Sequence, residues 1–465
     1  MSGDEDTRAD TEAPSEQERS AKNEPGHEPA GKKPEGKKPK KGKAPRRGAR
    51  REALSNLGGP VDSRGDRAFA FALASAMEAQ AEEADVLTHG FHTYPARMHP
   101  ALARVVLREF DLGPGSEVLD PFCGGGTVAV EAMVAGWRCL GSDLDPLALR
   151  LSRVKVERRR EPQRARFTEV LEAVAAASER RVRGRVEVRA ALSPEERSWY
   201  DVHVLKELAG LLEEIRAVRD KRDRQALEMV FSAIVVKFSR QRSETADRDA
   251  PRRLRKGLVT EFFLRKGREL VERWAALSEA LPERSHEPRF VQSDARRLPT
   301  TLSGEYRCDL VLTSPPYGGT YDYARHHARR HAWLGINAKH LREGEIGARR
   351  DLSQPHSKSG SARRGERRSG RVEAGKDAQA RWDQQVLDTL RTLHELLSPD
   401  AVAVLLMGDA QLGRVAVPAD RQLEALAPVA ELEFLAAASQ PRPEWWTGGH
   451  GQERREHLVA LRRPA

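Results

Sequence analysis

Cysteine, aromatic residues and long apolar runs are all scarce in this 465-residue chain. Its three cysteines, Cys123, Cys139 and Cys308, form no Cys-x-x-Cys pair, so the sequence supports neither a zinc site nor a disulfide framework. That usage favours a reducing compartment, and we expect a cytoplasmic protein. No apolar run approaches the roughly 18 residues of a membrane-spanning helix. The acidic, polar residues 1–14 are unlike a signal peptide.

Charge, in contrast, is abundant. Charged residues make up 32% of the chain and hydrophobic ones only 38%, which indicates that part of it lies outside a packed core. The net charge of +10 favours an anionic partner such as nucleic acid. Residues 1–52 have the composition of a disordered tail, acidic at first and then, over 32–51, almost purely Lys, Arg, Pro, Gly and Ala. This tail is either an electrostatic arm for DNA or a solvated linker.

The tetrapeptide Ser314-Pro315-Pro316-Tyr317 follows an apolar run, residues 308–313, that indicates a buried strand. Two consecutive prolines end strand pairing and fix a rigid turn. Such a turn can aim backbone carbonyls and the Ser314 hydroxyl at a flat, amine-bearing ring, while Tyr317 stacks on the face of that ring. Taken alone, an ordinary turn at a strand end explains the tetrapeptide equally well.

A second motif, Asp120-Pro121-Phe122-Cys123-Gly124-Gly125-Gly126-Thr127, lies between a short apolar strand and a helix-like run. Strand, glycine turn and helix together are typical of a site that holds a nucleotide-like ligand at the carboxyl end of the strand. The motif is neither the dinucleotide G-x-G-x-x-G nor a phosphate loop, since no Gly-Lys-Ser/Thr follows. A further strand ends at Asp143, about 20 residues beyond the glycines, where an acid can bind ribose hydroxyls.

Together the two motifs resemble those of the S-adenosylmethionine-dependent, amino-directed DNA methyltransferases. Two further segments resemble that family: residues 91–100, which would close over the methionine end of the cofactor, and Asp294 in residues 291–295, which would contact the adenine amine. The resemblance covers residues 88–150 and 286–335, plus a final strand at 455–461. It implies a Rossmann-like class I methyltransferase, an α/β fold with a seven-stranded, mostly parallel sheet, a helical insertion and a disordered basic N-terminal tail.

The resemblance also implies the site. S-adenosyl-L-methionine would be the methyl donor, with no metal, and nucleic acid, as double-stranded DNA, would be the partner. The catalytic residues implied are Ser314, Pro315, Pro316 and Tyr317. The cofactor-binding residues implied are Tyr94, Asp120, Pro121, Phe122, Gly124, Gly126, Thr127, Asp143 and Asp294.

The target amine stays open at this point. A serine at the first position of the catalytic motif favours N4 of cytosine over N6 of adenine. The cofactor motif precedes the catalytic one, however, whereas many serine-type cytosine enzymes have the opposite order. An RNA guanine-N2 methyltransferase shares the present order, although no RNA-binding accessory domain is evident near the N-terminus. The remaining alternative is a catalytically inert nucleic-acid-binding module on the same fold.

Four regions are predicted. They are the tail 1–52, a first methyltransferase part 53–160, a helical insertion 161–285 that is a candidate for target recognition, and a second methyltransferase part 286–465. Helices are expected at 66–84, 101–110, 127–136, 146–158, 167–181, 194–218, 222–240, 257–280, 379–397 and 418–426. Strands are expected at 116–120, 138–142, 289–292, 309–312 and 401–407, with a closing antiparallel hairpin of 432–435 and 457–461.

Several basic segments offer contacts to nucleic acid. Residues 237–245 and 252–256 mix cations with short hydrogen-bonding side chains, and 354–378 indicate a mobile basic loop. Residues 325–333 are dense in cations and imidazoles and predict a basic helix that faces nucleic acid. His327 and His331 there have the i, i+4 spacing of a metal pair, but no Glu accompanies them. Trp445 and Trp446 either stack on a base or pack in the interior.

Overall fold

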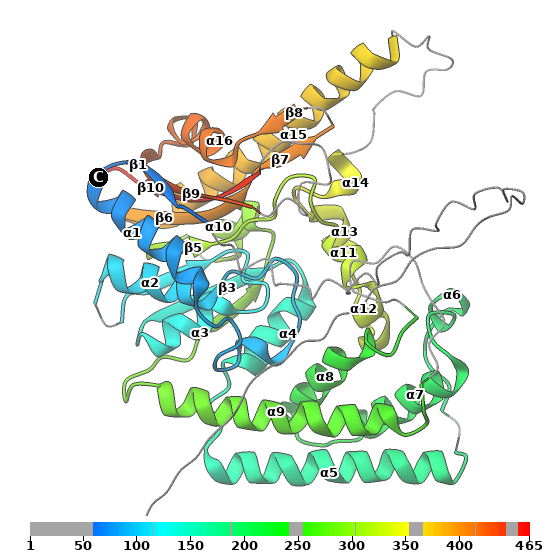
Figure 1. The fold of residues 1–465 in the computed structure, drawn as a ribbon. Coiled ribbons are helices and arrows are strands. Elements are labelled where there is room, and N and C mark those ends of the chain that lie inside the picture. Colours follow the sequence, from blue (N-terminus) through cyan, green and yellow to red (C-terminus); the bar gives the residue numbers. More distant parts are fainter. Residues whose placement is uncertain are drawn as a thin grey trace, which may run out of the picture. The chain divides into compact units, whose positions relative to one another are not determined.

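The computed structural model describes residues 59–113, 115–186, 188–240, 254–302, 304–352, 366–413, 415–442 and 454–465, with only the backbone of 366–374 (Figure 1). The tail 1–52, most of the basic cluster at 241–253, the first part of the basic loop and the tryptophan pair 445–446 lie outside the described residues. In the part of the chain that is described, no helix is both long and apolar enough to cross a membrane. The three cysteines are buried and free.

A twisted eight-stranded sheet forms the centre of the fold, in the order β1-β9-β10-β6-β5-β2-β3-β4. Its strands are β1 (Asp62–Gly65), β2 (Glu117–Asp120), β3 (Arg138–Asp143), β4 (Arg289–Gln292), β5 (Cys308–Thr313), β6 (Leu397–Gly408), β9 (Glu433–Pro441) and β10 (Arg455–Arg462). The strands β2 to β6 run parallel, whereas β10 pairs antiparallel with both β6 and β9. The predicted α/β class and the closing hairpin are confirmed.

The strand count differs from the expected seven. The eighth strand, β1, pairs antiparallel with β9, with Asp62 opposite Ser439. Its sequence, Asp-Ser-Arg-Gly, has neither apolar alternation nor β-branched residues, and three of its four residues are exposed. Only the partner strand makes this segment a strand, and Asp62 and its partner Ser439 are 377 positions apart, so no local pattern could predict it.

Helices cover both faces of the sheet, because successive strand residues point to opposite sides. Val118 and Leu310 pack with α1 (Arg67–Glu78), α2 (Pro100–Phe110) and α3 (Thr127–Val134). On the other face, Leu119 and Val311 pack with α15 (Glu366–Leu396) and α16 (Ala419–Leu426). The helix α4 (Pro146–Lys155) follows β3.

A helical insertion separates β3 and β4 in the sequence and has a core of its own. Its helices are α5 (Glu161–Arg183), α6 (Pro194–Arg197), α7 (Val202–Arg216), α8 (Lys221–Val235) and α9 (Leu258–Ala280). The long α5 and α9 lie side by side (Figure 1). Leu208, Leu211, Leu212 and Ile215 are fully or almost fully buried, as their helical spacing predicts. The core also contains Leu147 of α4, which links the insertion to the sheet.

Shorter elements complete the chain. They are α10 (Leu298–Thr301), α11 (Tyr323–His326), α12 (Ala328–Leu334), α13 (Lys339–Gly344), α14 (Arg349–Leu352), the hairpin of β7 (Ala410–Leu412) and β8 (Val415–Val417), and the 3₁₀ turns Ala79–Ala81, His89–Phe91, Ala295–Arg297 and Pro428–Ala430. The predicted loop 354–378 is wrong from Glu366 onward, where α15 already begins. The helix runs on through Gly375, where a Cβ atom would lie 2.9 Å from the Leu412 carbonyl oxygen, so close packing on the β7–β8 hairpin outweighs the low helix propensity of glycine there.

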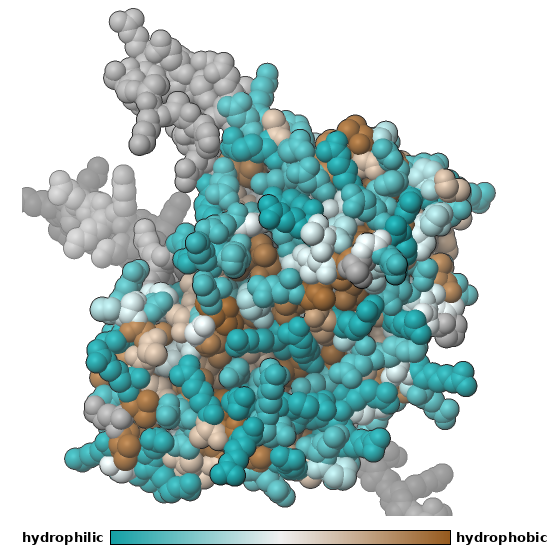
Figure 2. All heavy atoms as spheres, turned by 180° about the vertical axis from the view of Figure 1, so that it is seen from behind, coloured by the Kyte–Doolittle hydropathy of each residue, from teal (hydrophilic) through white to brown (hydrophobic). Residues whose placement is uncertain are grey.

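The face behind the view of Figure 1 carries mainly hydrophilic residues, with apolar ones scattered between them (Figure 2). This distribution agrees with a chain in which 32% of the residues are charged. Side chains that gather into a cavity lie instead at the carboxyl ends of the parallel strands.

Candidate active site

The two sequence motifs meet at one edge of the sheet. β2 pairs in parallel with β5, with Val118 beside Leu310 and Leu119 beside Val311, so the turns that follow both strands emerge together. A cavity opens there, as expected for an open parallel sheet. The predicted site residues that line it are Tyr94, Asp120, Pro121, Phe122, Gly124, Thr127, Asp143, Asp294, Ser314 and Pro316. Gly126, Pro315 and Tyr317 lie next to this group but do not line the cavity.

Asp120 ties the two turns to each other. Its Oδ1 accepts a hydrogen bond from the Phe122 amide at 3.2 Å and one from the Thr313 hydroxyl at 2.7 Å. Burial raises the pKa of Asp120 to about 7, against the opposing effect of these two donors. The carboxyl group therefore fixes the junction of β2 and β5 and is poised to change charge near neutral pH.

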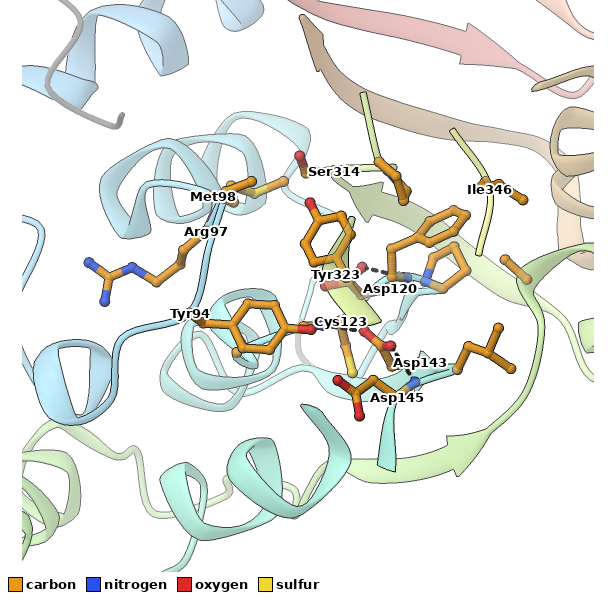
Figure 3. Close-up of a pocket in the computed structure, with 18 of the residues that line it drawn as sticks. Tyr94, Arg97, Met98, Asp120, Cys123, Asp143, Asp145, Ser314, Tyr323 and Ile346 are labelled. Carbon is orange, nitrogen blue, oxygen red and sulfur yellow. Dashed lines mark hydrogen bonds between the residues drawn. The ribbon is translucent and has the colours of Figure 1, made fainter. Parts of the chain in front are cut away.

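Asp143 holds the glycine turn from the next strand. Its Oδ2 accepts from the Gly124 amide at 2.9 Å and its Oδ1 from the Asp145 amide at 2.8 Å. Burial, together with the nearby Asp145, raises the pKa of Asp143 to about 7. Figure 3 shows this carboxyl group at the floor of the cavity, beside Cys123 and Asp145.

The glycine turn owes its shape to two close approaches. A Cβ atom on Gly124 would lie 2.8 Å from the Tyr94 ring, and one on Gly126 would lie 2.7 Å from the Ser152 hydroxyl oxygen. Both glycines also have positive φ angles, +45° and +75°. Gly126 thus seats the first turn of α3 against α4 and shapes the site without lining it.

Residues 91–100 form the wall opposite the glycine turn. The Tyr94 ring points toward Cys123 and Asp143, whereas the Arg97 side chain points away from them (Figure 3). Arg97 donates to the backbone carbonyls of His89 and Ala84 and pairs with Asp85, which anchors the segment. Burial raises the pKa of Tyr94 above its ordinary value, so its hydroxyl stays protonated.

Asp294 lies at the far end of the cavity, at the start of a 3₁₀ turn. Its Oδ1 accepts from the Arg296 amide at 3.0 Å, and its Oδ2 pairs with the Arg296 guanidinium at 2.6 Å. Arg296 in turn donates to the Gly344 carbonyl at 2.9 Å. An acid that already has a guanidinium partner can still accept from a ligand amine, because a carboxylate has about four lone-pair positions.

Tyr317 is placed differently from the sequence-based expectation. Its side chain is buried, and its hydroxyl lies 2.5 Å from Glu456 Oε1. The guanidinium of Arg442 lies over its ring, 5.3 Å from the centroid. The aromatic ring that lines the cavity beside Ser314 is that of Tyr323 (Figure 3). The segment 318–323 contains two tyrosines, Tyr321 and Tyr323, and its sequence alone does not tell which of them faces the cavity.

The prediction that residues 325–333 face nucleic acid is wrong for half of their basic side chains. His327, Arg330 and His331 are at most 4% exposed. His327 Nδ1 lies 2.8 Å from Asp145 Oδ2, and His331 Nε2 lies 2.9 Å from Asp145 Oδ1. The acid that the i, i+4 pair lacks in its own sequence thus comes from the N-cap of α4, 182 residues earlier.

These three side chains form a buried cluster whose ligand-type atoms lie within 4.8 Å of one another, a spacing that could hold a metal ion. The short N–O distances are those of ordinary hydrogen bonds. Although burial raises the pKa of Asp145, the hydrogen bonds from the two imidazoles outweigh it and hold that pKa below its usual range. We therefore describe the cluster as a hydrogen-bonded clamp on Asp145.

Two other lining residues, Met98 and Ser293, lie in segments that the sequence analysis singled out without naming them. Asp145, Glu345 and Ile346 also line the cavity and had no signal in the sequence. Glu345 Oε1 accepts from the Tyr323 amide at 2.5 Å, which fixes the segment that carries the cavity-lining tyrosine. Residues 344–346 reach the site only because α13 folds back over Asp294.

Comparison with known proteins agrees with these motifs. Residues 91–189 match the family described as RMKL-like, methyltransferase domain. The Type II methyltransferase M.BsoBI of Geobacillus stearothermophilus is 27% identical over 280 residues, which cover 55% of this chain and 54% of that protein. The tRNA (guanine(10)-N2)-dimethyltransferase of Methanothermobacter thermautotrophicus is 42% identical over 52 residues, 11% of this chain and 16% of that protein.

Among solved structures, TrmN from Thermus thermophilus superimposes with a TM-score of 0.29 and 16% identity, covering 79% of this chain and 49% of that one. The matches with M.BsoBI and with TrmN thus span about half the length of each relative. The chain resembles the amino-directed DNA methyltransferases.

Proposed function

We propose that this chain, which resembles the amino-directed DNA methyltransferases, transfers a methyl group from S-adenosylmethionine to an exocyclic amine of DNA. The observation that carries the proposal is the meeting of the Asp120–Thr127 turn with the Ser314–Tyr317 turn at adjacent strand ends, around one cavity. A cofactor half and an amine-holding half must lie side by side for direct transfer between two bound groups.

The residues present fit the cofactor. Thr127 lines the cavity at the start of α3, and its buried hydroxyl oxygen has no hydrogen-bond partner among the described residues. Beside it, the glycines leave room for close backbone approach, and a helix N-terminus favours an anionic group such as a carboxylate. Asp143 would accept from the ribose hydroxyls and Asp294 from the adenine amine, with Tyr94 closing over the opposite end.

When bound, S-adenosylmethionine supplies an electrophilic methyl group. The amine of a nucleobase is a poor nucleophile, because its lone pair is delocalised into the ring. The Ser314 hydroxyl and the Pro315 carbonyl would accept the two amine hydrogens and draw the nitrogen toward a tetrahedral geometry. The ring of Tyr323, which lines the cavity beside Ser314, would hold the base by stacking, whereas Tyr317 is buried and does not line the cavity. A base in duplex DNA must leave the stack to reach such a pocket.

We favour N4 of cytosine over N6 of adenine, because the motif begins with Ser314 and not with an acid. The insertion α5–α9 and its basic neighbours are the candidate for target recognition in double-stranded DNA, since they interrupt the methyltransferase elements between the cofactor and catalytic motifs. Accordingly, we propose the division into parts 53–160, 161–285 and 286–465 on the same grounds.

A second candidate is an RNA guanine-N2 methyltransferase. It is supported by the 42% identity over 52 residues with the tRNA (guanine(10)-N2)-dimethyltransferase, and by the order of the two motifs. The DNA assignment is supported by a longer alignment, of 280 residues, with M.BsoBI.

One experiment separates these candidates. The purified full-length chain is incubated with methyl-labelled S-adenosylmethionine and either unmethylated duplex DNA of mixed sequence or bulk RNA, and the product is digested to nucleosides for mass analysis. We expect N4-methyldeoxycytidine. N6-methyldeoxyadenosine or N2-methylguanosine would move the target to adenine or to RNA.

Substitutions test the residues. Ser314→Ala and Tyr317→Ala should lose transfer, whereas Ser116→Ala, at the opposite end of β2, should retain it. If both motif variants transfer methyl as well as the wild type, the assignment of this turn fails. If the wild type neither binds the cofactor nor transfers methyl, the chain is an inert module.

A further inference from the structure

A serine at the first motif position raises a question of hydrogen-bond direction. Holding an amine in the proposed way requires an acceptor at position 314. A carboxylate can only accept, whereas a serine hydroxyl can donate or accept and can rotate between the two. Something near Ser314 must therefore fix where its proton points, if the residue is to act as an acceptor.

The neighbours of Ser314 form a buried chain of polar groups. Ser314 lies three residues before Tyr317 in the same turn. Burial raises the pKa of Tyr317 overall, whereas the Ser314 hydroxyl acts as a hydrogen-bond donor that lowers that pKa. The Tyr317 hydroxyl lies 2.5 Å from Glu456 Oε1, and the same carboxylate oxygen pairs with Arg442. The side chains of Arg442 and Glu456 are only 2% and 5% exposed. The groups come from the turn after β5, the end of β9 and the start of β10, which the sheet brings together.

The direction of the hydrogen bonds between these buried groups follows from the donors available. The Glu456 carboxylate, facing a guanidinium that can only donate, is an acceptor. The single proton of the Tyr317 hydroxyl must then point to Glu456. Toward Ser314, Tyr317 offers only lone pairs, so Ser314 directs its own proton to Tyr317. The lone pairs of the Ser314 oxygen are left for the cavity that Ser314 lines.

We propose that Glu456 and Arg442 are positioning residues that, through the Tyr317 hydroxyl, hold Ser314 as a hydrogen-bond acceptor for the target amine. The inference rests on the proposed function and extends it to two residues 128 and 142 positions beyond Ser314. It also gives Tyr317, whose ring does not line the cavity, a role through its hydroxyl. Through Tyr317, Glu456 thereby makes Ser314 a hydrogen-bond acceptor, a property that an acid at position 314 would have without help.

The test compares Glu456→Gln, Tyr317→Phe and the double variant with the wild type. The readout is the rate of methyl transfer in a single turnover, at saturating DNA and cofactor. Tyr317→Phe keeps the ring and the Arg442–Glu456 pair but removes the hydroxyl. Each single variant should lower the rate about tenfold or more, as expected for loss of one charge-linked hydrogen bond. The double variant should be no slower than the worse single one, because both break the same chain.

Glu433→Gln is the matched control, since Glu433 pairs with Arg462 across the same two strands but at the exposed surface. It should transfer at the wild-type rate. A merely structural role of Glu456 would lower the melting temperature or the affinities and leave the rate in the saturated complex unchanged.

Two outcomes overturn the inference: wild-type single-turnover rates in Tyr317→Phe, or additive losses in the double variant. Tyr317→Phe decides the matter alone if Glu456→Gln does not fold. An inactive wild type would instead refute the proposed function, and the inference with it. An active wild type with unaffected variants refutes the inference only.

Discussion

The Thr313 hydroxyl donates a 2.7 Å hydrogen bond to the Asp120 carboxyl group, joining two residues that are 193 positions apart at the ends of β5 and β2. Both groups are buried, at 0% and 4% exposure. This bond sets the spacing between the turn that would hold the cofactor and the turn that would hold the amine. It is therefore a sensitive point at which to test the site.

Thr313→Val keeps the shape of the side chain and removes the donor. We expect it to lower the free energy of unfolding by about 1–3 kcal/mol at pH 8, where the Asp120 carboxyl is ionised. The loss should be smaller at pH 5, because the pKa of Asp120 is raised to about 7 and the group is then neutral.

Urea unfolding at the two pH values measures the effect. The control is Thr301→Val, which removes an exposed hydroxyl that faces Ser293 at 2.8 Å and should show no such dependence on pH. An equal loss at both pH values would contradict the assigned charge state of Asp120.

The raised pKa of Asp143 makes a second prediction, about stability and pH. Its folded-state pKa is about 7 and its unfolded value about 4, so the folded state binds the proton more tightly in this range. Stability from this group is present below pH 4 and is lost as the pH rises to 7. Relative to Asp143→Asn, the wild type should lose up to about 1.4 kcal/mol per pH unit between these values.

Asp143→Asn should also weaken cofactor binding by about tenfold, because a ribose hydroxyl loses a charged acceptor. Wild-type affinity should rise as the pH passes 7, and the affinity of the variant should not. Calorimetric titration with S-adenosylmethionine measures both. Asp309→Asn is the matched control, since Asp309 also accepts a backbone amide, that of Glu117, but away from the cavity.

The sequence predicted the elements whose cause is local. Asp120 and Gly124 lie in a strand–turn–helix pattern that needs few distant residues, and Ser314 follows an apolar strand that ends at two prolines. The prediction was incomplete where contacts with residues far away in the sequence decide how a side chain is placed. Tyr317 is turned toward Glu456, which is 139 positions away, and His327 toward Asp145, 182 positions away. No window of sequence contains both members of either pair.

The buried clamp of His327, His331 and Asp145 gives a third prediction. If the imidazoles serve as hydrogen-bond partners, the purified protein should contain no stoichiometric metal and should keep its melting temperature in the presence of a chelator. His327→Ala should lower the free energy of unfolding by about 2 kcal/mol or more, because Asp145 loses a buried partner.

Elemental analysis and thermal melts measure these outcomes, with His340→Ala as the exposed control. One equivalent of bound metal that disappears in His327→Ala would show that the cluster is a metal site.

The glycine turn gives the last prediction, in which backbone strain and steric collision can be separated. Gly126 and Gly335 have similar positive φ angles, +75° and +63°. A Cβ atom at Gly335 would meet nothing within 4 Å, whereas one at Gly126 would lie 2.7 Å from the Ser152 hydroxyl oxygen and 3.1 Å from its Cα. Gly335→Ala should therefore lower the free energy of unfolding only by the penalty of a left-handed backbone, about 1–2 kcal/mol.

Gly126→Ala should lower the free energy of unfolding clearly more, because α3 must also move away from α4. It should also weaken cofactor binding, whereas Gly335→Ala should leave that binding unchanged. Chemical unfolding and cofactor titration of both variants measure the difference. Equal losses of stability would mean that the turn tolerates the displacement, and the close packing of α3 on Ser152 would then not be what shapes the site.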